Sequence, residues 1–323
     1  MISVIIPVYN GERYIQTIVK SFERQKDIDF ELIFINDGSK DSSIDKLNSV
    51  RDSSSLKITI IDQKNSGVSS ARNVGIKNSK GELICFCDVD DDVTDGYISD
   101  MRDAMESNDV ELVICKHKLS QVYGTEVGDA IGTGKMIVKD SLSCLRDFLY
   151  GRMVTGCWTL MVKKELITKN DLWFAEGYKY SEDLHMVWRL IACSHNVVYL
   201  DKALYIYYLQ ENSATSKFNT ERFQGYELIK SLGSFMDEYS PQFAHEYKMY
   251  AASKIMWSIT WQASINYEFK KFKEFIKVHD VKKDMINLIP FRNPKVALSA
   301  ALFLLSPSIF RKLAIRYGKN LVH

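Results

Sequence analysis

The sequence has little of what marks several large protein classes. Its 42 Lys and Arg nearly balance 41 Asp and Glu, so the formal net charge of +1 offers no polyelectrolyte surface, and we expect no nucleic-acid partner. Only 5 prolines and 16 glycines among 323 residues exclude a collagen-like or low-complexity chain. The 6 cysteines lack paired C-x-x-C spacing, which argues against a zinc site or a disulfide framework and favours reduced thiols.

Two common phosphate-binding motifs are also missing. The first apolar run is followed by residues 7–11 (PVYNG) and not by G-x-G-x-x-G, so we expect no dinucleotide-binding Rossmann site. Gly134-Lys135 resembles the end of a P-loop, but Asp129 replaces its first glycine and Met136 its Ser or Thr. The sequence therefore gives no support for a kinase or an ATPase. It also lacks the G-x-S-x-G motif, so it gives no support for a serine hydrolase.

The N-terminus does not have the pattern of a signal peptide. Met1 runs directly into the apolar residues 2–6, with no basic region and no small-residue cleavage site. So short a run, closed by Pro7, predicts a buried strand instead. We therefore expect a cytoplasmic protein.

Apolar runs alternate with helical patterns over the first hundred residues. We expect strands at 2–6, 30–35, 58–61 and 83–86, with helices around 14–22, 42–50 and 68–78. Such strands, separated by helices, imply a parallel sheet covered on both faces, in which ligands bind beyond the carboxyl ends of the strands. Later elements are expected as strands at 110–115, 158–162 and 197–208, and as helices at 181–192, 221–238, 242–267 and 269–278.

The strongest local feature is the acidic run at 88–92 (DVDDD), at the end of an apolar strand. Its carboxylates repel one another unless a cation neutralises them, and hard oxygen ligands favour Mg²⁺ or Mn²⁺. The alternative is a solvated acidic loop or a helix N-cap. The D-x-D spacing is too short to decide between these two interpretations.

Three further features have plain structural alternatives. The pair Glu182-Asp183 opens a helical pattern, where acids also stabilise the first turn through the helix dipole. Asp37 follows a strand and could serve as a turn residue or cap. Arg72 interrupts an apolar helix pattern and could simply pair with a neighbouring acid near the surface.

Taken together, these segments resemble family-2 glycosyltransferases with the GT-A fold. The resemblance runs in order through residues 3–10 (SVIIPVYN), 31–41 (ELIFINDGSKD), 65–73 (NSGVSSARN), 81–91 (GELICFCDVDD), 158–160 (WTL), 174–177 (FAEG) and 181–183 (SED). It implies a Rossmann-like, mostly parallel mixed sheet flanked by helices, forming a catalytic domain over residues 1–215. Residues 216–323 would be a mainly helical C-terminal region.

The resemblance also implies roles for individual residues. Pro7, Val8 and Tyr9 match the nucleotide-facing first loop, and Asp37 matches the acid that accepts the uracil N–H. Arg72 matches an arginine on the donor side. In the D-x-D motif Asp88 would lie close to the ribose and Asp90 would hold Mn²⁺ or Mg²⁺. Asp183 matches the catalytic base, with Glu182 beside it as an orienting or acceptor-contacting group.

One departure from the family pattern concerns the diphosphate. Members often carry a basic residue after a Tyr-rich strand, whereas residues 205–208 (YIYY) are followed here by Leu209-Gln210. That basic group must come from elsewhere, with Lys217 as a candidate, or be missing.

The C-terminal tail is basic and partly apolar. No acid follows Met285, whereas six basic residues do, at positions 292, 295, 311, 312, 316 and 319. The apolar run 296–305 would make about 15 Å of helix, too short for a bilayer core of about 30 Å. A short apolar stretch flanked by cations favours an interfacial anchor on an anionic membrane surface over a packed terminal helix.

We therefore expect an inverting glycosyltransferase that moves a sugar from a nucleotide-sugar, UDP-linked donor to a hydroxyl of a lipid-linked glycan acceptor. It would act in surface polysaccharide synthesis, at the inner face of the cell membrane. Two alternatives remain open: a non-catalytic nucleotide-sugar-binding subunit of a glycan-assembly complex, and a sugar-1-phosphate nucleotidyltransferase. The latter should carry a Gly-rich, Arg-containing loop after the first strand, which residues 7–11 do not provide.

Overall fold

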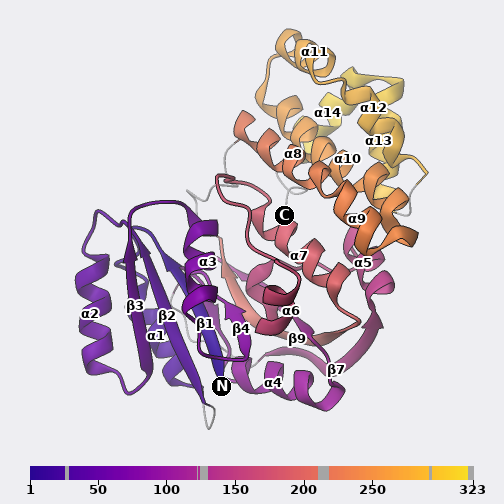
Figure 1. Cartoon of the computed structure of the whole chain (residues 1–323). Helices are drawn as coiled ribbons and strands as arrows, with labels where there is room; N and C mark the ends of the chain where they lie inside the picture. Colours follow the sequence, from indigo (N-terminus) through magenta and orange to yellow (C-terminus); the bar gives the residue numbers. More distant parts are fainter. Residues whose placement is uncertain (26–28, 122, 124–129, 210–217, 291–292, 319–323) are drawn as a thin grey trace. The chain divides into compact units, whose positions relative to one another are not determined.

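The computed structural model describes residues 1–25, 29–121, 123, 130–209, 218–290 and 293–318 (Figure 1). The chain forms two compact units. The first, here the sheet unit, comprises Met1–Cys144, Val154–Gly177 and Glu182–Glu211. The second, here the helical unit, comprises Leu145–Met153, Tyr178–Ser181 and Asn212–His323.

The first half of the sheet is parallel. Strands β1 (Ile2–Val8), β2 (Phe30–Asp37), β3 (Lys57–Gln63) and β4 (Leu83–Phe86) lie in the order β3-β2-β1-β4. Helices α1 (Ile15–Glu23), α2 (Ser43–Ser53) and α3 (Val68–Asn78) connect them. The central strands β1 and β2 are buried almost throughout, as their continuous apolar runs predict.

The second half of the sheet is mixed. It continues from β4 through β8 (Leu160–Lys163), β6 (Leu112–Ser120) and β9 (Asn196–Tyr208) to β5 (Asp92–Val93), while β7 (Ile131–Asp140) pairs with β9. Strand β8 is antiparallel to both of its neighbours, and β9 is parallel to β6 but antiparallel to β5 and β7. Helices α4 (Tyr97–Asn108), α5 (Ser141–Leu149), α6 (Lys164–Lys169) and α7 (Glu182–Cys193) complete this part of the chain. The expected mixed α/β sheet is confirmed.

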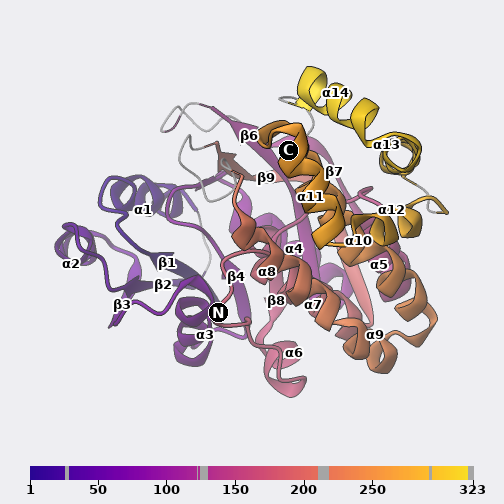
Figure 2. The same ribbon diagram turned by 90° about the horizontal axis from the view of Figure 1, so that it is seen from above.

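The helical unit is built around one long helix. Helix α10 (Pro241–Asn266) contacts α8 (Phe223–Ser231), α9 (Gly233–Tyr239), α12 (Val281–Leu288) and α14 (Pro307–Tyr317) (Figure 2). Helices α11 (Phe269–Val278) and α13 (Pro294–Leu305) complete the unit. Among the described residues, every helix is too short or too polar to cross a membrane.

Most predicted elements are confirmed within a few residues, but one helix is wrong. The stretch 221–238 is not continuous: after a short 3₁₀ turn at Thr220–Arg222, α8 ends before Leu232 and α9 begins at Gly233. Glycine weakens helix continuity, and the break lets both short helices pack against α10. The six cysteines are free thiols, as expected.

Candidate active site

The predicted nucleotide-site residues gather at one edge of the sheet. In the parallel register Val8 pairs with Asn36, and Ile5 pairs with Phe86. The segments that follow β1, β2 and β4 therefore leave the sheet at the same edge, where the carboxyl ends of these strands lie. This edge carries Tyr9 after β1, Asp37 at the end of β2 and Asp88 after β4.

The first loop is tied to the loop that follows β2. The backbone N–H of Asn10 donates to Ser39 Oγ at 3.0 Å, and the side chain of Asn10 accepts from the backbone N–H of Lys40 at 2.8 Å. Asn10 itself has a φ of 51°, a left-handed conformation that asparagine tolerates. Beside these contacts Pro7 is half-buried, Val8 is buried and the Tyr9 side chain is exposed, so Tyr9 can meet a ligand at this edge.

Asp37 organises the loop after β3. Its carboxylate accepts the backbone N–H groups of Ser66 at 2.8 Å and Gly67 at 2.9 Å, together with Gln63 Nε2 at 2.7 Å. A carboxylate has about four acceptor positions, so these three donors leave about one for a ligand. Asp37 thus stabilises a turn, which was the structural alternative to a role in binding, and it still has capacity to bind a ligand.

A buried arginine connects two acids that are far apart in the sequence. Arg72 on α3 donates to Asp88 Oδ1 at 2.8 Å and lies 3.4 Å from Glu182 Oε1. Its side chain is only 4% exposed, and its guanidinium lies over the ring of Phe174 at 5.2 Å. Burial alone would lower the pKa of Arg72, but the surrounding acids outweigh it and raise that pKa. Arg72 is therefore a permanent buried cation, not a surface residue.

The acidic run is not a uniform patch, because its members have different partners. Asp91 is buried and accepts Tyr205 Oη at 2.7 Å and the backbone N–H of Tyr208 at 3.0 Å. Asp92 accepts the N–H of Val93 at 2.7 Å and faces Arg24 at 3.5 Å. Asp91 and Asp92 thus hold the loop against β9 and α1, and Asp88 pairs with Arg72.

Asp90 is the member without such a partner. Among the described residues, no other side chain forms a hydrogen bond or a close ion pair with its carboxylate, although the charge of Arg13 attracts it and opposes the rise of its pKa. Burial, followed by repulsion from Asp88, raises the pKa of Asp90 to about 6. In the described part of the chain, no three His, Cys, Asp or Glu residues are arranged so that they could hold a metal ion together. Magnesium and its relatives commonly take one or two carboxylates and phosphate oxygens, so Asp90 fits a divalent metal that a nucleotide diphosphate completes.

The two acids at the start of α7 both resist ionisation. Burial, with repulsion from Asp183, raises the pKa of Glu182 to about 7, although Arg72 opposes the shift. Burial also raises the pKa of Asp183, again against the effect of Arg72. Asp183 Oδ1 accepts the backbone N–H of Leu184 at 2.7 Å, and the carboxylate also interacts with its own backbone N–H, so local backbone groups are its hydrogen-bond partners among the described residues. A carboxylate of raised pKa is a stronger proton acceptor when ionised.

The structure thus brings four of the predicted site residues together through contacts and charge: Arg72, Asp88, Glu182 and Asp183. Asp90 joins them through its interaction with Asp88. Pro7, Val8, Tyr9 and Asp37 lie at the same sheet edge without a hydrogen bond to that cluster among the described residues. Lys217, the candidate for the missing basic group, lies outside the described residues.

Two residues with a structural part in the site were missed. Tyr205 accepts the backbone N–H of Asp88 at 3.1 Å while donating to Asp91, so one hydroxyl fixes the acidic run at two points. Asn73 donates to Phe174 O and Glu176 Oε1 at 3.0 Å each and accepts the N–H of Phe174 at 2.8 Å. Asn73 ends the segment 65–73 that carries the family resemblance, and Tyr205 opens the Tyr-rich stretch 205–208, so these positions were the available signals.

Comparison with known proteins points to the same family as the sequence resemblance. The model of the family described as glycosyl transferase family 2 matches residues 3–162. The uncharacterised glycosyltransferase EpsJ of Bacillus subtilis is 32% identical over 219 residues, which cover 67% of this chain and 63% of EpsJ. The poly(ribitol-phosphate) beta-N-acetylglucosaminyltransferase TarS of Staphylococcus aureus is 25% identical over 232 residues, 71% of this chain and 39% of TarS. The chain thus spans less than two thirds of these two relatives.

Solved structures agree on the fold. A crystal structure of S. aureus TarS residues 1–349 matches with a TM-score of 0.70 at 19% identity, covering 98% of this chain and 91% of that one. The same fragment in complex with UDP-GlcNAc gives a TM-score of 0.65 at 19% identity, with the same coverage. The mannosyltransferase PcManGT from Pyrobaculum calidifontis, in complex with GDP-Man and Mn²⁺, gives 0.58 at 12% identity, covering 95% of this chain and 87% of that one.

The structure has the GT-A fold, as the sequence resemblance implied. The chain belongs to glycosyltransferase family 2.

Proposed function

We propose that this protein transfers a sugar from a UDP-sugar to a hydroxyl group of a glycan acceptor, with inversion at the anomeric carbon. The observation that carries the proposal is the cluster of Arg72, Asp88, Glu182 and Asp183 at the carboxyl edge of the sheet. It is supported by family membership and by TarS, whose matching fragment forms a complex with UDP-GlcNAc. In this proposal residues 1–215 form the catalytic domain, and residues 216–323 form a mainly helical C-terminal region with a basic, membrane-associating tail.

The donor would lie along the sheet edge. Pro7, Val8 and Tyr9 would face the nucleotide, with the exposed ring of Tyr9 as a contact surface. Asp37 would use its remaining acceptor position for the uracil N–H, and Asp88 would lie near the ribose. Arg72, held by Asp88 and Glu182, would keep positive charge on the donor side.

Asp90 would hold a divalent metal, Mn²⁺ or Mg²⁺, with oxygens of the donor diphosphate as further ligands. Such a metal, when bound, supplies Lewis-acid neutralisation of the charge that develops on the leaving diphosphate. The support for this role is an unpartnered, half-buried carboxylate beside a second acid, which costs free energy until a cation binds.

Asp183 would act as the catalytic base. The Asp183 carboxylate takes the proton of the acceptor hydroxyl while the hydroxyl oxygen of the acceptor forms a bond to the anomeric carbon. The bond between the anomeric carbon and the diphosphate oxygen breaks, and UDP leaves with the electron pair. One base and one displacement give inversion without a covalent enzyme intermediate. Glu182, bound to Arg72, would orient the acceptor or its neighbour Asp183.

The acceptor would be a lipid-linked glycan of a surface polysaccharide, reached at an anionic membrane surface. The support lies in α13 and α14, which expose several large apolar side chains to solvent: Leu298 (74%), Leu305 (84%), Ile309 (50%) and Ile315 (49%). The exposed cations Lys295, Lys312 and Arg316 lie on the same two helices. Apolar side chains that enter the headgroup region, flanked by cations, are the composition of an interfacial anchor.

The donor part of the proposal is tested by thermal unfolding of the full chain with Mn²⁺ and either UDP, GDP or one of four UDP-sugars. We expect UDP and at least one sugar among UDP-glucose, UDP-galactose and their N-acetyl forms to raise the Tm, because a ligand that binds only the folded state stabilises it. Stabilisation by GDP and by none of the uridine compounds would contradict the proposed donor.

A further inference from the structure

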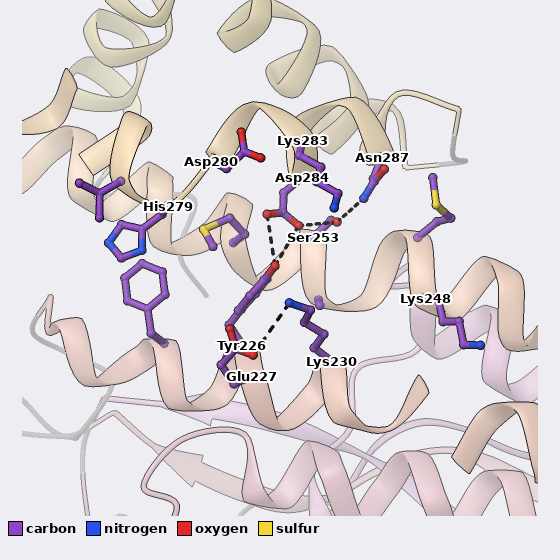
Figure 3. A pocket seen from close by; sticks show the side chains of 15 residues that line it. Tyr226, Glu227, Lys230, Lys248, Ser253, His279, Asp280, Lys283, Asp284 and Asn287 are labelled. Atoms are coloured by element: carbon purple, nitrogen blue, oxygen red, sulfur yellow. Dashed lines mark hydrogen bonds and ion pairs between the residues drawn. The ribbon is translucent and has the colours of Figure 1, made fainter. Parts of the chain in front are cut away.

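A pocket lies within the helical unit, between α8, α10, the end of α11 and α12 (Figure 3). Its volume of about 560 Å³ falls in the range of small-ligand sites. None of its lining residues belongs to the site described above. Four hydrogen-bonding side chains point into its centre in Figure 3, from three helices: Tyr226, Ser253, Asp284 and Asn287.

These four side chains form one connected polar group. Ser253 Oγ donates to Asp284 Oδ1 at 2.8 Å, and Asn287 Nδ2 donates to Ser253 Oγ at 3.2 Å. The hydroxyl of Tyr226 lies 3.4–3.5 Å from both oxygens of Asp284, a long contact. Because a carboxylate has about four acceptor positions, Asp284 keeps acceptor capacity for hydroxyl groups of a ligand.

Apolar surfaces lie beside this polar group. Met249, Ala252 and Met256 contribute the α10 side of the pocket. At the other end the rings of Phe223 and His279 stack at 4.1 Å, with 17° between their planes. The pocket thus offers hydrogen-bonding groups and apolar surface within one small volume.

The charges around the pocket restrict what it can hold. Asp284 is only 7% exposed, and its carboxylate would repel an anion that entered to its depth. Three lysines (Lys230, Lys248 and Lys283) and three acids (Glu227, Asp280 and Asp284) line the pocket, so the formal charges of the lining balance and favour neither a cationic nor an anionic ligand. Lys248 is paired with Asp237, and Lys230 lies 4.0 Å from Glu227, so no concentrated positive patch is left to bind a phosphate.

We propose that this pocket binds a neutral saccharide unit. Sugar hydroxyl groups can donate to Asp284 and exchange hydrogen bonds with Asn287 and Tyr226, while the C–H faces of the ring pack on the methionines or the ring pair. The volume accommodates a mono- or disaccharide. The inference rests on the proposed function for the source of this saccharide, a segment of the glycan acceptor, which the pocket would hold separately from the reacting hydroxyl.

The test measures binding to the full chain in the absence of any nucleotide sugar, so that its failure is distinct from a failure of the transfer activity. Cellobiose, lactose and N,N′-diacetylchitobiose are titrated and followed by saturation-transfer NMR, with glycerol phosphate and putrescine as charged probes. The variants are Asp284→Asn and Asn287→Ala. Glu274→Gln is the matched control, because Glu274 is an exposed carboxylate of the same unit that does not line the pocket.

We expect at least one disaccharide to bind wild type and Glu274→Gln equally, and both pocket variants about tenfold or more weakly, a loss of about 1.4 kcal/mol. Should Asp284→Asn fail to fold, as its melting curve would show, Asn287→Ala decides alone. No disaccharide binding, binding unchanged in the folded pocket variants, or binding of only a charged probe would each overturn the proposal. Asp183→Asn, which lies in the other unit, should bind the disaccharide as wild type does.

Discussion

At the scale of single residues, the acids of the run 88–92 have different partners, which the motif alone does not show. Four of the five residues 88–92, which follow β4, are aspartates. Asp91 and Asp92 accept hydrogen bonds from backbone and side-chain donors, and Asp88 pairs with Arg72. Only Asp90 lacks such a partner among the described residues. The family resemblance pointed to Asp90 as the metal-holding acid, but the different partners of the other acids depend on Tyr205 and Arg24, whose positions only the tertiary structure fixes.

The role of Asp183 can be separated from simple helix capping. Asp183→Asn removes the proton acceptor and nearly preserves volume, so turnover should fall by about 10²–10⁴-fold. Affinity for UDP with Mn²⁺ should hardly change, because neither contacts Asp183 in the proposed arrangement. The side-chain oxygen of asparagine can accept the backbone N–H of Leu184 as Asp183 does, so the first turn of α7 should keep this contact. Near-normal kcat at an unchanged Tm would therefore reduce Asp183 to a cap, and Glu182 would be the next candidate for the base.

The ionisation of Glu182 should make the free energy of unfolding depend on pH. Its folded-state pKa of about 7 lies above the ordinary 4.5, so the stability it contributes is present below about pH 4.5 and lost as pH rises through 7. Glu182→Gln abolishes this titration. The free energy of unfolding of the variant relative to wild type should thus rise by about 1–3 kcal/mol between pH 4.5 and pH 8.

Chemical denaturation at the two pH values measures this difference, with Glu165→Gln as a control because Glu165 is exposed on α6. A difference between Glu182→Gln and wild type that stays constant with pH, or shrinks as pH rises, would contradict the assigned ionisation.

At the scale of elements, strands and helices with a buried apolar face were predictable and the others were not. Strands β1 and β2 are buried almost throughout, so their apolar runs marked them clearly. Strand β7 was missed because its residues are nearly all exposed, which leaves no alternation to detect. The two-residue strand β5 is too short for any periodic signal. Asp37 and the loop after β3 were each visible, but their hydrogen bonds were not.

Asp37→Ala should affect both the loop after β3 and the preference of the protein for UDP over CDP. Loss of the carboxylate leaves the N–H groups of Ser66 and Gly67 without their acceptor, which should destabilise the fold by about 1–3 kcal/mol. A direct bond to the uracil N–H, which cytosine lacks, should make the wild type prefer UDP to CDP. The variant should lose most of that preference.

Calorimetric titration of both nucleotides with Mn²⁺ checks this expectation, and Gln63→Leu serves as the control because it removes one donor to Asp37 and keeps the carboxylate. If UDP and CDP weaken equally in Asp37→Ala, the residue acts through the loop alone.

At the scale of the whole molecule, the C-terminal helices α13 and α14 carry both buried and exposed apolar side chains, which the sequence alone did not distinguish. Val296, Ala300, Phe303, Phe310 and Ala314 are buried, and the rings of Phe303 and Phe310 meet at 5.2 Å, whereas Leu298 and Leu305 are exposed. Packing and exposed apolar surface thus coexist in α13 and α14. Deleting the tail would remove buried side chains from the helical unit, so substitutions at exposed positions are the cleaner test of membrane association.

Leu298→Glu combined with Leu305→Glu should abolish sedimentation with anionic liposomes, because each exposed leucine is replaced by a charge of the same sign as the lipid. High salt should release part of the wild-type protein through screening. Ile131→Glu, at a 67% exposed apolar residue of β7, is the matched control and should sediment as wild type does. Wild-type protein that never sediments with such liposomes would rule out the anchor.

The central claim is that the acids at the sheet edge support sugar transfer from a uridine nucleotide, and release of UDP by purified protein with Mn²⁺ and acceptor glycan tests it most directly. We predict UDP release from at least one of UDP-glucose, UDP-galactose and their N-acetyl forms, with Asp90→Ala and Asp183→Asn inactive or slowed by about 10²-fold or more. UDP release at the wild-type rate by both variants, or no release from any UDP-sugar while GDP-mannose is consumed, would contradict the account.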